Sequence, residues 1–160
     1  MTEMPPAGGR VAVAADHNGV DLKRRLLAWL ADHGYSADDR GVEGREPVDY
    51  PPLCADVCAE ILGGRAHRGL IIGGSGMGEH IACNKVRGIR AGLCHSLFTA
   101  EISRGNNDAN VLILGSKVVA PDLAEDILER WMHTPFKGGV HQQRLEQIAA
   151  LERGEDIRRR

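Results

Sequence analysis

The chain has 160 residues, which is enough for one well-buried domain and short for two. It is 42% hydrophobic and 26% charged, as globular proteins usually are, and its net charge of −2 gives no general attraction to nucleic acid or to an anionic membrane. No apolar run approaches the roughly 20 residues that span a bilayer, and the N-terminus lacks the apolar core of a signal peptide. We therefore expect a cytoplasmic protein without nucleic-acid or membrane partners.

After an arm at residues 1–9 that contains Pro and Gly and is expected to be flexible, short apolar runs alternate with helical patterns. The runs predict strands at 11–15, 35–41, 69–72, 89–94 and 111–114, the second being the most polar. Apolar residues at helical spacing predict helices at 20–33, 53–62, 97–104, 121–131 and 141–152, and a further helix from His80. Ser96 is a predicted N-cap, and Leu145, Ile148 and Leu151 share one side of the last helix. The alternation predicts a single α/β domain at 10–152 around a parallel sheet, with a solvated tail at 153–160.

The cysteines do not indicate a disulfide framework or a metal site. Cys54 and Cys58 lie one helical turn apart, but no further His or Cys grouping completes a set of metal ligands. Cys83 and Cys94 fit the packing of a core better than catalysis. We therefore expect no bound metal.

The stretch LIIGGSGMGEHIACNK, residues 70–85, places a glycine-rich loop between a buried strand and a helix. Glu79 stands where the strand, the loop and the helix N-terminus meet. The loop can leave main-chain N–H groups uncovered for an anion, and it consists of Gly74, Ser75, Gly76, Met77 and Gly78. The alternative is a tight turn followed by a Glu that only favours the helix dipole.

The place of this loop argues against a dinucleotide dehydrogenase, whose glycine fingerprint follows the first strand. The first strand here ends in Asp16 and His17 instead, and the carboxyl ends of later strands add His95, Ser96 and Lys117 as candidate ligand groups. A carboxylate beside N–H donors suits removal of a proton next to a carbonyl, because the donors stabilise the enolate-like oxygen. This chemistry needs no cofactor, but it requires Glu79 to be partly desolvated.

Five ordered stretches make residues 10–152 similar to the ribose-5-phosphate isomerase type B and galactose-6-phosphate isomerase family. They are VAVAADHNGVDLK, the DYP at 49–51, GGSGMGEHIACNKVRGIRAGLC, SRGNNDANVLILGSKVV and GGVHQQRLEQI. The resemblance implies a Rossmann-like three-layer α/β/α sandwich with a five-stranded parallel sheet. It also implies a homodimer or dimer of dimers in which the neighbouring subunit completes each site.

The resemblance further implies roles for individual residues. One branch of the family has a cysteine base at the position of Gly73 and another has a glutamate at the position of Glu79, so the chain resembles the glutamate branch. Ser75 matches a hydroxyl residue that helps protons move between substrate oxygens, and the loop of Gly74, Gly76, Met77 and Gly78 matches the oxyanion-stabilising loop. Candidate substrate contacts are Asp16, His17, Tyr50, Asn106, Asn107 and His141, and Lys117 and Arg144 match phosphate contacts that come from the second subunit.

Three positions depart from the family pattern. Asn106 stands where ribose-specific members have a histidine thought to open the sugar ring, and Val140 and Lys117 stand where they have arginines. A tetrose 4-phosphate cannot close a five- or six-membered ring, so it would not need that histidine.

The expected function is the aldose–ketose isomerisation of a phosphorylated sugar through an enediolate, with ribose 5-phosphate and ribulose 5-phosphate as the first choice. A tetrose phosphate such as erythrose or erythrulose phosphate is the second, and a non-catalytic sugar-phosphate-binding protein is the third. Several single residues have structural alternatives: His17 as a helix cap, Asn106 as a turn former, His95 as a structural histidine and His141 as a plain first residue of a helix.

Overall fold

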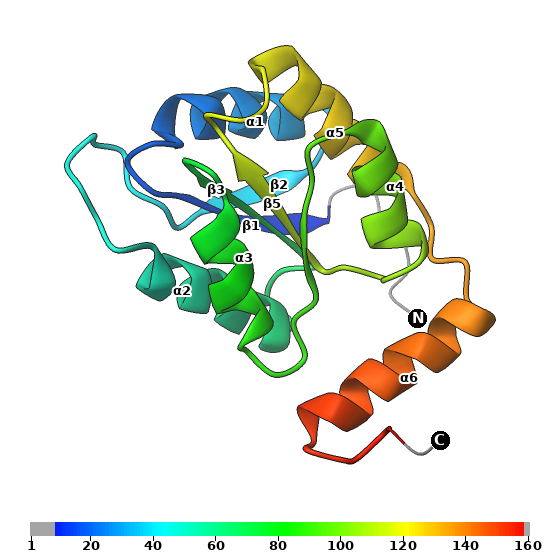
Figure 1. The fold of residues 1–160 in the computed structure, drawn as a ribbon. Coiled ribbons are helices and arrows are strands. Elements are labelled where there is room, and N and C mark those ends of the chain that lie inside the picture. The colour runs from blue at the N-terminus through cyan, green and yellow to red at the C-terminus, as the bar shows by residue number, and fades with distance from the viewer. Residues whose placement is uncertain (1–8, 159–160) are drawn as a thin grey trace.

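The three central strands of the sheet are almost wholly buried, as strands covered on both faces of a parallel sheet are. A computed structural model describes residues 9–158 (Figure 1). Its single sheet is parallel throughout and has the order β2-β1-β3-β5-β4. The strands are β1 (Arg10–Ala15), β2 (Ser36–Asp39), β3 (Arg68–Gly73), β4 (Ala91–Leu93) and β5 (Val111–Gly115).

Helices cover both faces of the sheet and bury two separate apolar layers (Figure 1). On one face lie α1 (Val20–Asp32), α4 (Leu97–Gly105) and α5 (Pro121–His133), packed around Trp131 and Leu26. On the other face lie α2 (Tyr50–Leu62) and α3 (Met77–Asn84), packed around Val57, Cys58 and Cys83. The predicted three-layer α/β/α sandwich with a five-stranded parallel sheet is confirmed.

The last helix, α6 (Val140–Glu152), extends away from this sandwich (Figure 1). Leu145 is buried on it, as its predicted apolar side requires, but Ile148 and Leu151 are 46% and 56% exposed. None of the helices in residues 9–158 has the length and the apolar character of a bilayer span.

Several element boundaries differ from the sequence-based prediction. α2 begins at Tyr50 rather than at residue 53, because Pro51 and Pro52 occupy its first turn, where a missing N–H removes no helical hydrogen bond. α3 begins at Met77, three residues before the predicted start, so Glu79 lies inside its first turn. β4 is shorter than predicted, since Ile89 donates its N–H to Val86 in a turn instead of joining the sheet.

The ends of the chain are described only in part. Of the predicted arm at 1–9, only Gly9 is described, and its carbonyl accepts a hydrogen bond from the Ser36 N–H at 3.2 Å. Residues 159–160 of the predicted tail also lie outside the described part.

The strand order creates one position where a ligand can enter. The chain leaves β1 toward the edge strand β2, but it leaves β3 toward the opposite edge, where β4 lies. The connections therefore diverge above the carboxyl ends of β1 and β3, which is where open α/β sheets bind their ligands.

Candidate active site

The glycine loop lies at the carboxyl end of β3, where the connections diverge. Ser116 donates its main-chain N–H to the Gly73 carbonyl at 2.8 Å, and Lys117 donates to the Gly74 carbonyl at 2.9 Å, so the end of β5 holds the loop by its carbonyls. The N–H groups of Gly74, Ser75 and Gly76 have no acceptor among residues 9–158. Gly76 has φ +78° and a Cβ there would lie 2.7 Å from Leu93 Cδ1, so the turn requires glycine. Uncovered N–H groups in such a loop form an anion site.

The Glu79 side chain is 4% exposed and reaches back from α3 over the end of β3. A Cβ built on Gly73 would overlap the Glu79 carboxylate, so the carboxylate occupies the space that a side chain at position 73 would fill. Burial raises the pKa of Glu79 and the charge of Asp16 raises it further, against a hydrogen bond from its own main-chain N–H. A carboxylate with a raised pKa is a stronger base than one in water.

Asp16 and its neighbours form the β1 side of the crevice. The Asp16 N–H donates to the Ile72 carbonyl at 3.1 Å, which ties the end of β1 to β3. Its carboxylate accepts hydrogen bonds from the Asn18 main-chain N–H at 2.8 Å and from Asn18 Nδ2 at 3.1 Å. His17 does not cap α1, whose N-cap is Gly19; instead its Nδ1 accepts the Val48 N–H at 3.3 Å.

Asn18 also lies at the candidate site, although no local sequence pattern marks it. Its side chain lies against Gly74, where an added Cβ would be 3.3 Å from Asn18 Cγ. Its carbonyl accepts the Ser116 hydroxyl at 2.9 Å, so this residue joins β1, the glycine loop and the end of β5. Its position at the end of the first strand was the available signal.

Tyr50 and Ser75 complete the group around the loop. The hydroxyl end of the Tyr50 ring packs so closely on Gly78 that a Cβ at Gly78 would overlap it. Ser75 Oγ accepts the Met77 N–H at 3.2 Å, which leaves the hydroxyl hydrogen available to a ligand. Met77 itself is 54% exposed.

Of the remaining predicted site residues, one lies beside the glycine loop and the others lie elsewhere in the chain. The main chain of Lys117 lies beside the glycine loop of its own chain, so Lys117 is also a candidate for the site of that chain, while its phosphate contact from a second subunit stays a prediction. Asn106 and Asn107 follow α4 at the amino-terminal edge of the sheet, and His141 and Arg144 lie on α6. His95 is exposed beyond β4, and its N–H donates to Thr99 Oγ1 at 3.0 Å.

The cysteines near the site are buried. Cys54, Cys58 and Cys83 pack together between α2 and α3, and Cys54 Sγ donates to the Glu79 carbonyl at 3.9 Å. Hydrogen bonds with Cys54 and Cys58, together with burial, raise the pKa of Cys83, which keeps it a thiol. Cys94 is fully buried as well, so the packing role predicted for Cys83 and Cys94 is confirmed. Within residues 9–158 no group of three or more His, Cys, Asp or Glu side chains is arranged to hold a metal ion.

Comparisons with known proteins identify the family of this chain. The model of the Ribose/Galactose Isomerase family matches residues 11–148. Ribose-5-phosphate isomerase B of Escherichia coli (strain K12) is 41% identical over 143 residues, which cover 89% of this chain and 96% of that protein. D-erythrulose-4-phosphate isomerase of Pectobacterium atrosepticum is 34% identical over 147 residues, covering 91% and 96%. The structure of Clostridium thermocellum ribose-5-phosphate isomerase B superposes with a TM-score of 0.89 at 41% identity, covering 91% of this chain and 98% of that one. The chain therefore belongs to the ribose/galactose isomerase family.

Proposed function

We propose that this protein interconverts an aldose phosphate and a ketose phosphate without a cofactor, with Glu79 as the base. The observation that carries the proposal is the buried Glu79 carboxylate at the end of β3, beside three main-chain N–H groups that have no acceptor among the described residues. A base next to fixed donors is the arrangement that enolisation needs.

The proton balance follows from this placement. The Glu79 carboxylate takes the proton from C2 of the open-chain aldose, and the electron pair of the broken C–H bond moves into the enediolate. The charge that develops on the carbonyl oxygen is stabilised by the N–H groups of the loop, which acts as an oxyanion hole. Glu79 returns the proton to C1, and the Ser75 hydroxyl assists the transfer between O2 and O1, which gives the ketose.

The first-choice substrate is ribose 5-phosphate, with ribulose 5-phosphate as the product, because that is the substrate named for the Escherichia coli relative. A tetrose phosphate is the second candidate. It is favoured by Asn106 in place of a ring-opening histidine, and by the 34% identity to the Pectobacterium enzyme, which is named for erythrulose 4-phosphate.

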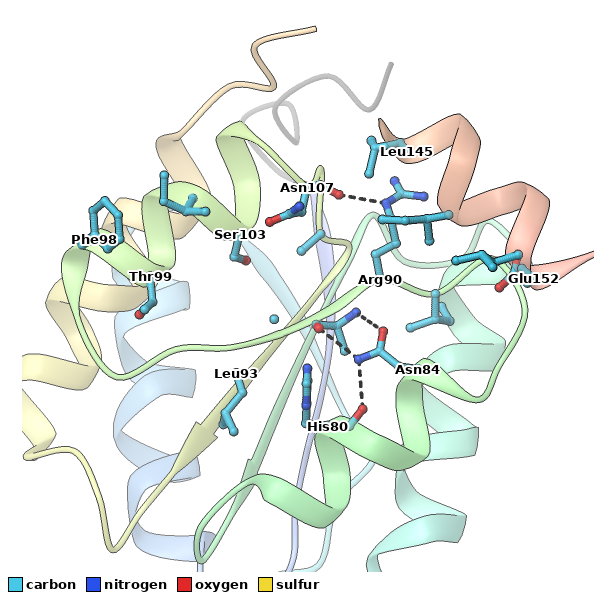
Figure 2. Close-up of a pocket in the computed structure, with 17 residues that line it drawn as sticks. His80, Asn84, Arg90, Leu93, Phe98, Thr99, Ser103, Asn107, Leu145 and Glu152 are labelled. Carbon is cyan, nitrogen blue, oxygen red and sulfur yellow. Dashed lines mark hydrogen bonds between the residues drawn. The ribbon is translucent and has the colours of Figure 1, made fainter. Parts of the chain in front are cut away.

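The phosphate end of the substrate requires cationic groups, and those of α6 are remote from the loop in one chain. We infer that a second copy brings Arg144 and His141 to the site, in a homodimer or dimer of dimers, while Lys117 comes from the chain that carries Glu79. An apolar cavity of about 670 Å³ between α6 and the sandwich supports this assembly (Figure 2). Large apolar side chains are exposed on the helices around it, namely Met77, Ile81, Leu97, Phe98, Ile148 and Leu151.

A kinetic panel across four-, five- and six-carbon sugar phosphates tests the function. We expect the highest kcat/KM with ribose 5-phosphate, and a fall of at least about a hundredfold in Glu79→Gln. The exposed Glu129→Gln on α5 is the matched control and should keep full activity.

Each other outcome of the panel has a definite meaning. A maximum with erythrose 4-phosphate assigns the tetrose reaction instead. Binding of sugar phosphates without any turnover assigns a binding protein and overturns the isomerase proposal. Normal turnover by Glu79→Gln removes Glu79 as the base.

A further inference from the structure

The turn after α4, which carries Asn106 and Asn107, is held by an arginine that has no part in the site of its own chain. Arg90 Nε donates to the carbonyls of Asn107 at 2.9 Å and Asp108 at 3.2 Å. Its Nη2 donates to the Asp108 carbonyl at 2.8 Å and to Asp108 Oδ2 at 3.1 Å. Figure 2 shows Arg90 turned toward Asn107 at the side of the cavity, across from Leu145 of α6. One guanidinium thus fixes the main chain at two successive residues.

The turn that Arg90 holds has an unfavourable backbone conformation. Asp108 has φ +44°, a left-handed value that residues other than glycine rarely adopt. A second arginine, Arg104, is 1% exposed and donates Nη1 to Asp108 Oδ1 at 2.9 Å and to the Ala109 carbonyl at 2.7 Å. Nε and Nη2 of Arg104 have no hydrogen-bond partner in the part of the chain that is described, although burying such donors is costly. A strained backbone conformation that neighbouring side chains hold in place, here at the cost of burying Arg104, is typical of functional positions.

The turn and Glu79 lie at opposite ends of the same sheet. Asn110, just after the turn, bonds to Gly69 at the start of β3, whereas the Glu79 carboxylate lies over Gly73 at its end. The two glycines are four residues apart in a strand, or roughly 13 Å. The Asn107 side chain is exposed and borders the cavity, on the face where we place a second copy.

We infer that Arg90 is a positioning residue for the active site of the neighbouring copy. It fixes the carbonyls of Asn107 and Asp108, and so presents Asn107 to the sugar phosphate bound above the other chain's Glu79. The inference rests on the shared site of the proposed function. It adds that Arg90 gives the turn at Asn107 and Asp108 the shape with which this turn enters the neighbouring site.

The first test is the change from Arg90 to Lys. Lysine keeps the charge but lacks the planar fork that reaches two carbonyls at once. Displacement of Asn107 should lower kcat/KM by about tenfold to a hundredfold. The exposed Arg87→Lys in the same connection is the matched control and should keep its activity. Full activity of Arg90→Lys would overturn the inference.

Mixed oligomers separate positioning from a general loss of structure. Two chains with different affinity tags are co-expressed, and the species that carries both tags is purified. Asn107→Ala paired with Glu79→Gln should recover about half of the activity, because one of two symmetric sites then has both an intact base and an intact turn. Arg90→Lys paired with Glu79→Gln should recover to the same level, and Arg90→Lys paired with Asn107→Ala should not recover.

The outcomes distinguish this inference from the proposed function. If Asn107→Ala is rescued by Glu79→Gln and Arg90→Lys is not, the site is shared but Arg90 does not act through the donated turn, and the inference fails alone. If neither pair recovers while the unaltered protein isomerises sugar phosphates, the shared site is wrong and the inference falls with it, but the isomerase function stands.

Discussion

Glu79 carries its charge where that charge is unfavourable, because burial and the nearby Asp16 both raise its pKa. A group whose pKa is raised by folding contributes stability only while it is protonated, and this contribution is lost as the pH rises from the ordinary carboxyl value through the raised one. Above that window the folded protein therefore bears the cost of a buried negative charge.

We expect Glu79→Gln to be more stable than the unaltered protein at pH 7 and above, because the neutral amide does not bear that cost. The difference should shrink as the pH falls through the raised pKa and disappear where the carboxyl group is protonated in both the folded and the unfolded state. Thermal unfolding across this pH range measures it. A stability gap that is independent of pH would show that the Glu79 charge is not desolvated.

Among single residues, local sequence patterns predicted the groups that are neighbours in the chain. They did not predict Asn18, whose contacts form between separate strands. Glu79, Ser75 and the glycine loop are close neighbours in the chain, so their spacing was informative. Asn18 touches Gly74 and accepts from Ser116, contacts that exist only after β1, β3 and β5 have paired. The placement of Lys117 beside its own loop also depends on this pairing.

Among the helices and strands, those whose ends carry a clear local sequence signal were predicted best. Ser96 forms a capping box with Thr99, accepting the Thr99 N–H at 3.2 Å while its own N–H donates to Thr99 Oγ1 at 3.1 Å, as an N-cap should. The short β2 was predicted too long, at 35–41, because its polar sequence does not define its ends. It is fixed by tertiary contacts, since Lys23 of α1 is 1% exposed and donates to both oxygens of the Asp39 carboxylate at 2.8 Å.

We expect Lys23→Met to lower the free energy of unfolding by about 2–3 kcal/mol, because it removes a buried ion pair, takes its donor from the Val42 carbonyl and leaves the Asp39 carboxylate with the Gly41 N–H. The change should loosen the edge of the sheet at β2. Chemical denaturation measures the loss. Arg24→Ala on the exposed side of the same helix is the control and should change stability by less than about 0.5 kcal/mol. Equal effects of the two changes would contradict a special role for Lys23.

At the scale of the whole molecule, the sequence predicted the layers of the sandwich but not the position of α6. The apolar residues of α6 predicted a packed helix, yet Ile148 and Leu151 remain largely exposed within one chain. An intrachain pattern of apolar residues does not tell whether the same chain or another copy covers them. If the proposed shared site is correct, the separation of Asn107 and Arg144 from Glu79 has the same origin, because a site built from two chains has no fixed spacing in one sequence.

If the face around the cavity between α6 and the sandwich pairs with a second copy, Phe98→Glu should weaken the association by more than about tenfold. Phe98 is 72% exposed beside this cavity, so a charge there would be buried on assembly. Sedimentation velocity should then show monomers with native circular dichroism, and activity should fall with the loss of the partner's residues. Leu62→Glu, at a 52% exposed position at the end of α2, is the matched control and should leave the assembly intact. Fully active Phe98→Glu monomers would contradict the shared site.

The central claim, that the Glu79 carboxylate removes the proton next to the sugar carbonyl, is tested most directly by exchange with solvent. The protein and its Glu79→Gln variant are incubated with ribose 5-phosphate in deuterated water, and deuterium at C2 of the recovered aldose is followed by NMR. We predict incorporation by the unaltered protein and a rate at least about a hundredfold lower in Glu79→Gln. Incorporation at an equal rate by both proteins would contradict the account.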